Sequence, residues 1–115
     1  MTQLHKILKE LKLLGVSGVK QSTEDEGSSF EDIKFMRKIT KEVGIKLNVK
    51  IGGCEAKNDI NFCKRIKVDS IIAPMVESSY ALKKFVQYAS LDKNCLHFFM
   101  LETQQSFYNV KNIIN

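Results

Sequence analysis

Four short apolar segments recur along the chain, and acidic, glycine or small polar residues follow each of them at once. The four junctions are Val19–Gly27, Val49–Ala56, Ile71–Ser79 and Phe98–Ser106, which read VKQSTEDEG, VKIGGCEA, IIAPMVESS and FFMLETQQS. An amphipathic stretch comes after each junction. A strand, a polar turn and a helix in fourfold succession predict four consecutive βα units.

Apolar residues at spacings of three and four predict the helices. The predicted helical segments are Thr2–Leu14, Phe30–Val43, a stretch from about Lys57 to Ile66, a stretch that begins after Ser78 or Ser79, and Ser106–Ile114. Ser29 followed by Asp32 is close to a capping box, and Gly44 is placed to end the second helix. Along that helix we expect Phe30 to face the interior with the other apolar residues.

The predicted strands are Val16–Gln21, Ile45–Ile51, Val68–Ala73 and Leu96–Leu101. Helices and strands alternate throughout, which indicates an α/β fold with a parallel sheet. A complete (β/α)8 barrel needs about 250 residues, and this chain has 115. We therefore expect a partial, half TIM barrel of about four parallel βα units with an N-terminal helix. Residues 1–115 would form one incomplete domain with open sheet edges and an apolar inner face.

Composition is that of a soluble globular chain, with 43% hydrophobic and 27% charged residues. No apolar run approaches the roughly 18 residues that span a bilayer, and lysines interrupt the N-terminal apolar residues where a signal peptide would need a continuous core. We expect a cytoplasmic protein without a membrane partner. The three cysteines form no CxxC, which argues against a disulfide framework or a zinc site.

The net charge of +5 comes almost entirely from lysines scattered over predicted helix faces. Aromatic residues do not interleave with them in the way that RNA-binding surfaces require. We therefore expect solvated helix faces and no nucleic-acid partner.

Polar candidates for chemistry lie at the junctions. Three carboxylates, Glu24, Asp25 and Glu26, come directly after the first strand, and their mutual repulsion requires solvent or a cation to compensate it. The alternative interpretation is an exposed acidic loop near a helix N-terminus. Lys50 ends the second strand beside Gly52 and Gly53, where a ligand can approach the backbone closely.

An ammonium group at this position suits a carboxylate or a carbonyl oxygen of a substrate. The alternative is an exposed lysine at the end of a strand. Glu102 ends the fourth strand after four apolar residues, and a hard cation would compensate its carboxylate. A single carboxylate is a weak signal for a metal. Glu77 follows the third strand, where an acidic residue at a helix N-terminus explains it equally well.

In their order, the four junctions resemble the HpcH/HpaI aldolase and citrate lyase beta subunit family of phosphoenolpyruvate/pyruvate-binding TIM barrels. STEDEG is similar to an acidic cluster after an early strand, and NVKIGG places Lys50 where the family has an arginine in a "vRv" pattern. IIAPMVESS is similar to "ivlPmVEs", and LETQQSFYNVKNI to "iET" followed by a helix. The resemblance covers roughly residues 16–115.

The resemblance implies a metal-dependent carbon–carbon lyase or aldolase that acts on an oxo-acid or acyl-CoA substrate through a pyruvate-like enolate. It implies Mg²⁺ or Mn²⁺ with Glu102 as a ligand, and Lys50 as the group that neutralises the enolate oxygen. Lys50, Glu24 and Asp25 are the candidate catalytic residues, and Lys50, Gly52 and Gly53 the candidate substrate-binding residues.

Two departures from the family pattern matter. Lysine in place of arginine loses bidentate geometry, and the second metal-ligating aspartate of the family has no counterpart in the chain. We therefore expect a fragment of such an enzyme, completed by its missing half or by self-association. The alternative is a small non-catalytic α/β domain that binds an anion or a protein.

Overall fold

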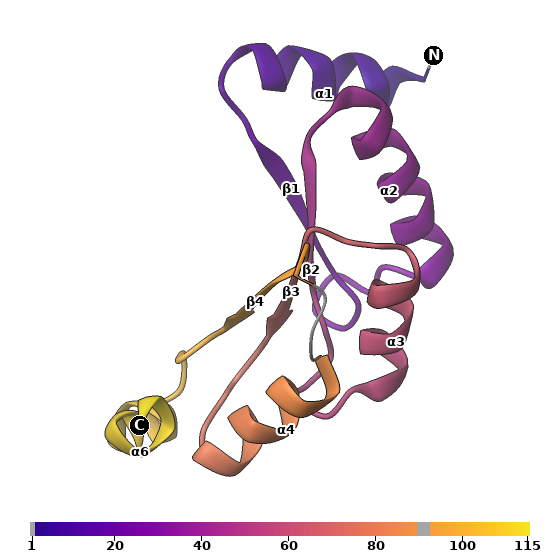
Figure 1. The fold of residues 1–115 in the computed structure, drawn as a ribbon. Coiled ribbons are helices and arrows are strands. Elements are labelled where there is room, and N and C mark those ends of the chain that lie inside the picture. The colour runs from indigo at the N-terminus through magenta and orange to yellow at the C-terminus, as the bar shows by residue number, and fades with distance from the viewer. Residues whose placement is uncertain (1, 90–92) are drawn as a thin grey trace.

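The computed structural model describes residues 2–89 and 93–115, and this part of the chain contains four parallel strands and six helices (Figure 1). The elements follow in the order α1 (Gln3–Leu13), β1 (Gly18–Ser22), α2 (Phe30–Val43), β2 (Lys46–Lys50), α3 (Lys57–Arg65), β3 (Ser70–Ala73), α4 (Ser79–Ala89), β4 (Leu96–Phe99), α5 (Gln104–Tyr108) and α6 (Val110–Ile114). The predicted class, a partial repeat of βα units, is confirmed.

Helix boundaries follow from local capping. Ser29 accepts a hydrogen bond from the Asp32 N–H, and the Asp32 carboxylate accepts one from the Ser29 N–H. This is the reciprocal capping box that the spacing of the two residues predicts. Gly44 ends α2 with φ 83°, a left-handed conformation that glycine adopts without a steric penalty. The Ser78 hydroxyl accepts from the Ala81 N–H at the start of α4.

The sheet has the order β1-β2-β3-β4, and all neighbours pair in parallel. Parallel pairing puts the carboxyl ends of the four strands at one edge of the sheet. The helices α2, α3 and α4 follow one another along one side of the sheet, and the opposite side is open in the described part of the chain (Figure 1). Helix α1 lies beyond the start of β1, across the top of the view, and packs against α2. The arrangement is that of consecutive βα units in a barrel wall.

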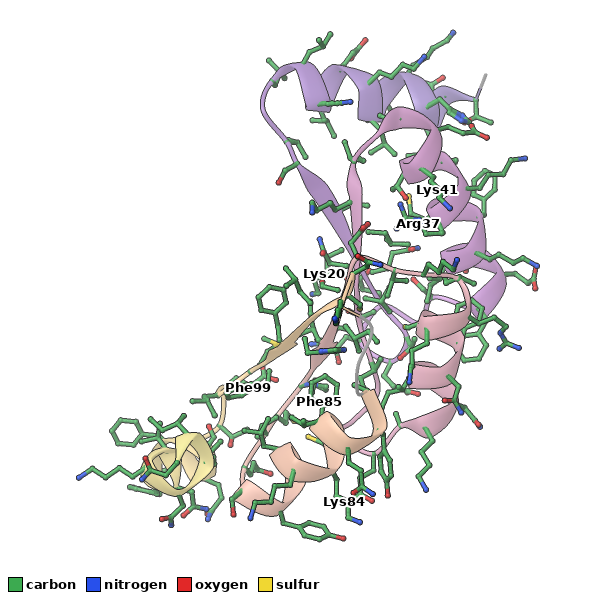
Figure 2. All side chains as sticks on the ribbon, in the orientation of Figure 1. Lys20, Arg37, Lys41, Lys84, Phe85 and Phe99 are labelled. Atoms are coloured by element: carbon green, nitrogen blue, oxygen red, sulfur yellow. The ribbon has the colours of Figure 1, made fainter. Side chains whose placement is uncertain are left out.

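A continuous apolar core lies between the helices and the sheet. Leu47, Val49 and Ile71 are fully buried on the helix-facing side of β2 and β3. The Phe85 ring lies between α4 and the sheet, where its plane is nearly perpendicular to that of His97 (Figure 2). A smaller cluster around Leu8 joins α1 to α2. Burial of one face of every helix explains the periodicity in the sequence.

The open side of the sheet differs from the expectation. Side chains alternate along a strand, so the rows Lys20–Asn48–Ser70–Leu96 and Ser22–Lys50–Ile72–Phe98 lie on the face opposite the core. Ser70 donates to Asn48 within the first row, at 2.6 Å. The prediction of an apolar inner face is therefore wrong over β1 and β2. Apolar side chains gather only toward β4, where Leu96 and Phe98 are exposed.

Two helical predictions also need correction. The single last helix predicted over 106–114 is two short helices. Thr103 caps α5, which begins two residues before the predicted start, and the helix is interrupted at Asn109. The Asn109 side chain donates to the Glu77 carbonyl at 2.9 Å, which fixes that break. Phe30, predicted to face the core, is partly exposed and stacks on Phe62 at a centroid distance of 4.2 Å.

Within the described ranges, none of the helices has both the length and the apolar character that crossing a membrane requires.

Candidate functional site

The carboxyl ends of the strands enclose an open cavity of about 1090 Å³. Its lining includes every residue that the sequence singled out for catalysis, substrate binding or metal binding, namely Glu24, Asp25, Lys50, Gly52, Gly53 and Glu102. These residues come from three junctions that are far apart along the chain. Parallel pairing brings the junctions to one edge of the sheet, which is where α/β enzymes place their active sites.

Lys50 is the positive group at the floor of this cavity. It is the last residue of β2, its side chain is only 10% exposed, and its ammonium group forms an ion pair with the Asp25 carboxylate. The hydrogen bond with Asp25 raises the pKa of Lys50 against the opposing effect of burial, and the charges of Asp25, Glu102 and Glu26 add to it. The same contact lowers the pKa of Asp25. Lys50 therefore carries a fixed positive charge and does not act as a base at neutral pH.

The other two acidic side chains of this junction make different contacts. Glu26 accepts a hydrogen bond from the Ser22 hydroxyl at 3.3 Å, and its carboxylate lies 3.9 Å from the Lys20 ammonium. Glu24 covers Gly52, where an added Cβ would lie 2.8 Å from the Glu24 Cγ. Glycine at position 52 thus makes room for a side chain of the protein itself. At Gly53 an added Cβ meets nothing within 4 Å, so this glycine faces open space.

Asp59, which the sequence pattern did not single out, holds two of the junctions together. One oxygen, Oδ2, accepts hydrogen bonds from the Thr23 hydroxyl at 2.7 Å and from the Gly52 N–H at 2.9 Å. Asp59 lies in the first turn of α3, so it fixes the β1 and β2 junctions relative to that helix. The position of Asp59 near a helix N-terminus was the one sequence signal for it, but its partner Thr23 lies 36 residues away along the chain.

Glu102 joins the cavity lining from the junction that follows β4. Its Oε1 accepts a hydrogen bond from the Met75 N–H at 2.9 Å. Met75 has φ 44°, in the left-handed region that residues with a side chain rarely adopt. Glu77 is bonded to the Thr103 hydroxyl at 2.9 Å and is absent from the cavity lining.

Acidic groups outnumber basic groups in the cavity lining. The carboxylates belong to Glu24, Asp25, Glu55, Asp59 and Glu102, and the ammonium groups to Lys50 and Lys57. The Lys57 ammonium lies 4.4 Å from the centroid of the Tyr88 ring. The lining therefore carries a net negative formal charge, and Lys50 and Lys57 are the groups in it that attract an anion.

A divalent cation is not fully provided for by these residues. Within 2–89 and 93–115, no three histidine, cysteine or acidic side chains lie close enough together to hold a metal ion. Glu102 offers one carboxylate and already accepts a backbone hydrogen bond. The described residues therefore do not complete the metal site that the resemblance implies.

Cys54 and Cys63 do not add a reactive group. Burial raises the pKa of the Cys54 thiol, and it raises that of Cys63 to about 12. Both stay protonated near neutral pH and are poor nucleophiles.

Comparison with known proteins shows one architecture. No protein-family model and no curated protein match the sequence. Among solved structures, the crystal structure of citrate synthase SbnG matches with a TM-score of 0.80 at 15% identity, covering 95% of this chain and 51% of that one. A variant of the same enzyme matches with a TM-score of 0.73 at 15% identity, covering 95% of this chain and 48% of the variant.

This chain has the fold of about half of citrate synthase SbnG. At 15% identity the likeness concerns the fold alone. It agrees with the predicted half barrel, because the chain spans about half the length of the structures it matches. The cavity lies at the carboxyl ends of the strands of this fold.

Proposed function

We propose that this chain carries part of the active site of a carbon–carbon lyase or aldolase that binds an oxo acid, or an acyl-CoA, through a pyruvate-like enolate. The observation that carries the proposal is the nearly buried, positively charged Lys50 at the end of β2, at the floor of a cavity shaped by four strand ends. A half-barrel likeness to a citrate synthase supports the same class of chemistry.

Lys50 would stabilise the negative charge that develops on the substrate oxygen. An ammonium group fixed in a site of restricted solvent access stabilises an oxyanion more strongly than it does in water. The raised pKa of Lys50 keeps this charge in place at neutral pH. Glu24 is the candidate for proton transfer, because it lines the cavity and has no ion pair assigned to it in the described structure.

The resemblance also implies Mg²⁺ or Mn²⁺, with Glu102 as one ligand. Such an ion would act as a Lewis acid on the substrate oxygen. Because no three histidine, cysteine or acidic side chains of the described residues lie close enough together to hold a metal ion, we propose that the remaining ligands come from a further polypeptide segment. That segment would be the second half of the barrel or another copy of this chain.

The open face supports a partner of this kind. Phe98 is 50% exposed on β4, and the outer edges of β1 and β4 have no neighbouring strand in the described structure. The unpaired edges of a parallel sheet can form hydrogen bonds with further strands, and closing eight strands into a barrel removes both edges.

A calorimetric titration with oxalate, a stable analogue of the pyruvate enolate, tests the proposal. Wild type should bind oxalate, Lys50→Met should bind it at least tenfold more weakly, and Mn²⁺ should strengthen binding in wild type but not in Glu102→Ala. Lys57→Met is the matched control, since it removes the other ammonium of the cavity and should change binding much less. Equal loss in both lysine variants would contradict the assigned role of Lys50.

A second candidate is a non-catalytic α/β domain that binds an anion or a protein. The incomplete set of metal ligands favours it. It predicts oxalate binding that depends on Lys50 but is the same with and without Mn²⁺, in a protein that elutes as a monomer in gel filtration.

A further inference from the structure

The two members of the Lys50–Asp25 ion pair differ in their surroundings. The Lys50 side chain is 10% exposed and is held by β2, whereas the Asp25 side chain is 63% exposed and belongs to the loop after β1. An ammonium group so little exposed requires a negative partner. Lys50 thus has a fixed position, and the carboxylate that meets it comes from the solvent side of the cavity.

The loop geometry allows Asp25 to leave without unfolding. The Gly27 N–H bonds to the Glu24 carbonyl at 3.1 Å, and the Ser28 N–H bonds to the Ser22 carbonyl at 3.2 Å. Asp25 is therefore a central residue of a turn whose base is closed by backbone bonds. Rotation of its side chain alone breaks the contact with Lys50.

The neighbouring acids of the cavity are held differently. Asp59 is tied to Thr23 and Gly52, and Glu102 to the Met75 N–H. In the described part of the chain, the Asp25 carboxylate has one hydrogen-bond partner, the Lys50 ammonium. Of these three acids, Asp25 is the one that can be exchanged for another anion with the least loss of structure.

We propose that Asp25 is an internal stand-in for the anionic group of the substrate, which occupies the anion position at Lys50 in the empty site and is displaced when an oxo acid binds. The inference rests on the proposed function, because it assumes that Lys50 is the anchor of the substrate. Asp25 thereby acts as a specificity-determining residue. A ligand must offer Lys50 a carboxylate or an oxyanion to displace it, and a neutral isostere cannot.

The Lys50–Asp25 ion pair has two effects on the empty site. An unpaired Lys50 would bind any small anion that reached it, and in the empty site its poorly solvated ammonium group would have no negative partner. Asp25 prevents both. It also weakens binding of the correct substrate, because the ligand has to replace an existing ion pair.

The test measures oxalate and the neutral isostere oxamide by calorimetry on wild type, Asp25→Asn and Glu26→Gln. Asp25→Asn should bind oxalate about fivefold more tightly than wild type, which is the upper range for losing competition from a partly exposed ion pair. Glu26→Gln removes the same charge from the same loop but leaves the Lys50 contact, so oxalate affinity should change by less than about twofold. No variant should gain affinity for oxamide.

A second readout follows the side chain itself. The contact with Lys50 lowers the pKa of the Asp25 carboxyl in the free protein, and carbon-13 NMR should show this pKa rising toward its ordinary value when oxalate saturates the site. Asp25→Asn must also lose oxalate binding when combined with Lys50→Met, because the gain depends on the freed ammonium.

The outcomes separate the two proposals. If wild type binds oxalate through Lys50 while Asp25→Asn binds no more tightly than Glu26→Gln, the role of Asp25 is wrong and the proposed function stands. If neither wild type nor Asp25→Asn binds oxalate, Lys50 is not a substrate anchor and both fall. A depressed Asp25 pKa that persists in the oxalate complex also overturns the displacement.

Discussion

Replacing Asp69 by asparagine should destabilise the fold without touching the cavity. Asp69 precedes β3, and its Oδ2 accepts hydrogen bonds from the Leu47 N–H at 2.8 Å and from the Arg37 guanidinium at 2.7 Å. Arg37 projects from α2 toward the sheet (Figure 2). The contact joins α2, β2 and β3 at the amino-terminal end of the sheet, which in barrel folds serves stability and not catalysis.

The expected loss of stability follows from how far the two side chains are exposed to solvent. The Arg37 side chain is 11% exposed and that of Asp69 32% exposed. Removing one partner of a fully buried ion pair costs about 3–5 kcal/mol, and exposed pairs contribute about 1 kcal/mol or less. For this partly buried pair with an additional backbone bond we expect a loss of about 2 kcal/mol in the free energy of unfolding. That is a large fraction of the roughly 5–15 kcal/mol typical of a domain.

Dependence on pH supplies an independent check. Burial alone would raise the pKa of Asp69, but the hydrogen bonds from the Leu47 N–H and from Arg37 outweigh it, and the pKa lies below its ordinary value. A carboxyl with a lowered pKa in the folded state stabilises that state above its unfolded pKa of about 4. The contribution is lost as the pH falls through the folded pKa. The difference between wild type and Asp69→Asn should therefore shrink as the pH falls below about 4.

Urea unfolding followed by far-ultraviolet circular dichroism measures these differences, because the chain has no tryptophan for fluorescence. The urea midpoint should fall by about 1 M for a slope of about 2 kcal/mol/M. Glu10→Gln, an exposed charge change on α1, should stay within about 0.5 kcal/mol of wild type. A loss below about 0.5 kcal/mol in Asp69→Asn, or a loss that does not shrink in acid, would refute the reasoning.

Three further predictions concern the core, the cavity and the open face. Phe85 is fully buried, so Phe85→Ala should cost about 3–5 kcal/mol, read from urea unfolding, and a cost below about 1 kcal/mol would contradict its place in the core. Gly52→Ala forces the Glu24 side chain aside and should cost about 1 kcal/mol in the same assay; no change would mean that Glu24 is loosely held. Phe98→Glu should weaken self-association at tens of micromolar in light scattering, and a wild type that is already monomeric there would count against a second copy on the open face.

Much of the candidate site could be predicted from the sequence, because the residues of a strand end are consecutive. Once strands were read from apolar runs and helices from their spacing, parallel pairing had to bring Glu24, Lys50 and Glu102 to the same edge of the sheet. Asp59 could not be found in this way. It reaches the site from a helix, and its partners Thr23 and Gly52 are 36 and 7 residues away.

The order of the elements, the capping of α2 and the location of polar residues at the strand ends could be read from the amino-acid sequence alone. These features depend on periodicity and on residues a few positions apart, such as Ser29 and Asp32. The folded chain was needed to show that Asp25, and not Glu24 or Glu26, forms the ion pair with Lys50. It was also needed to show that the open face of the sheet is polar over β1 and β2. Those outcomes depend on strand register and on the path of a loop, because these fix which residues far apart in sequence come into contact when the chain folds.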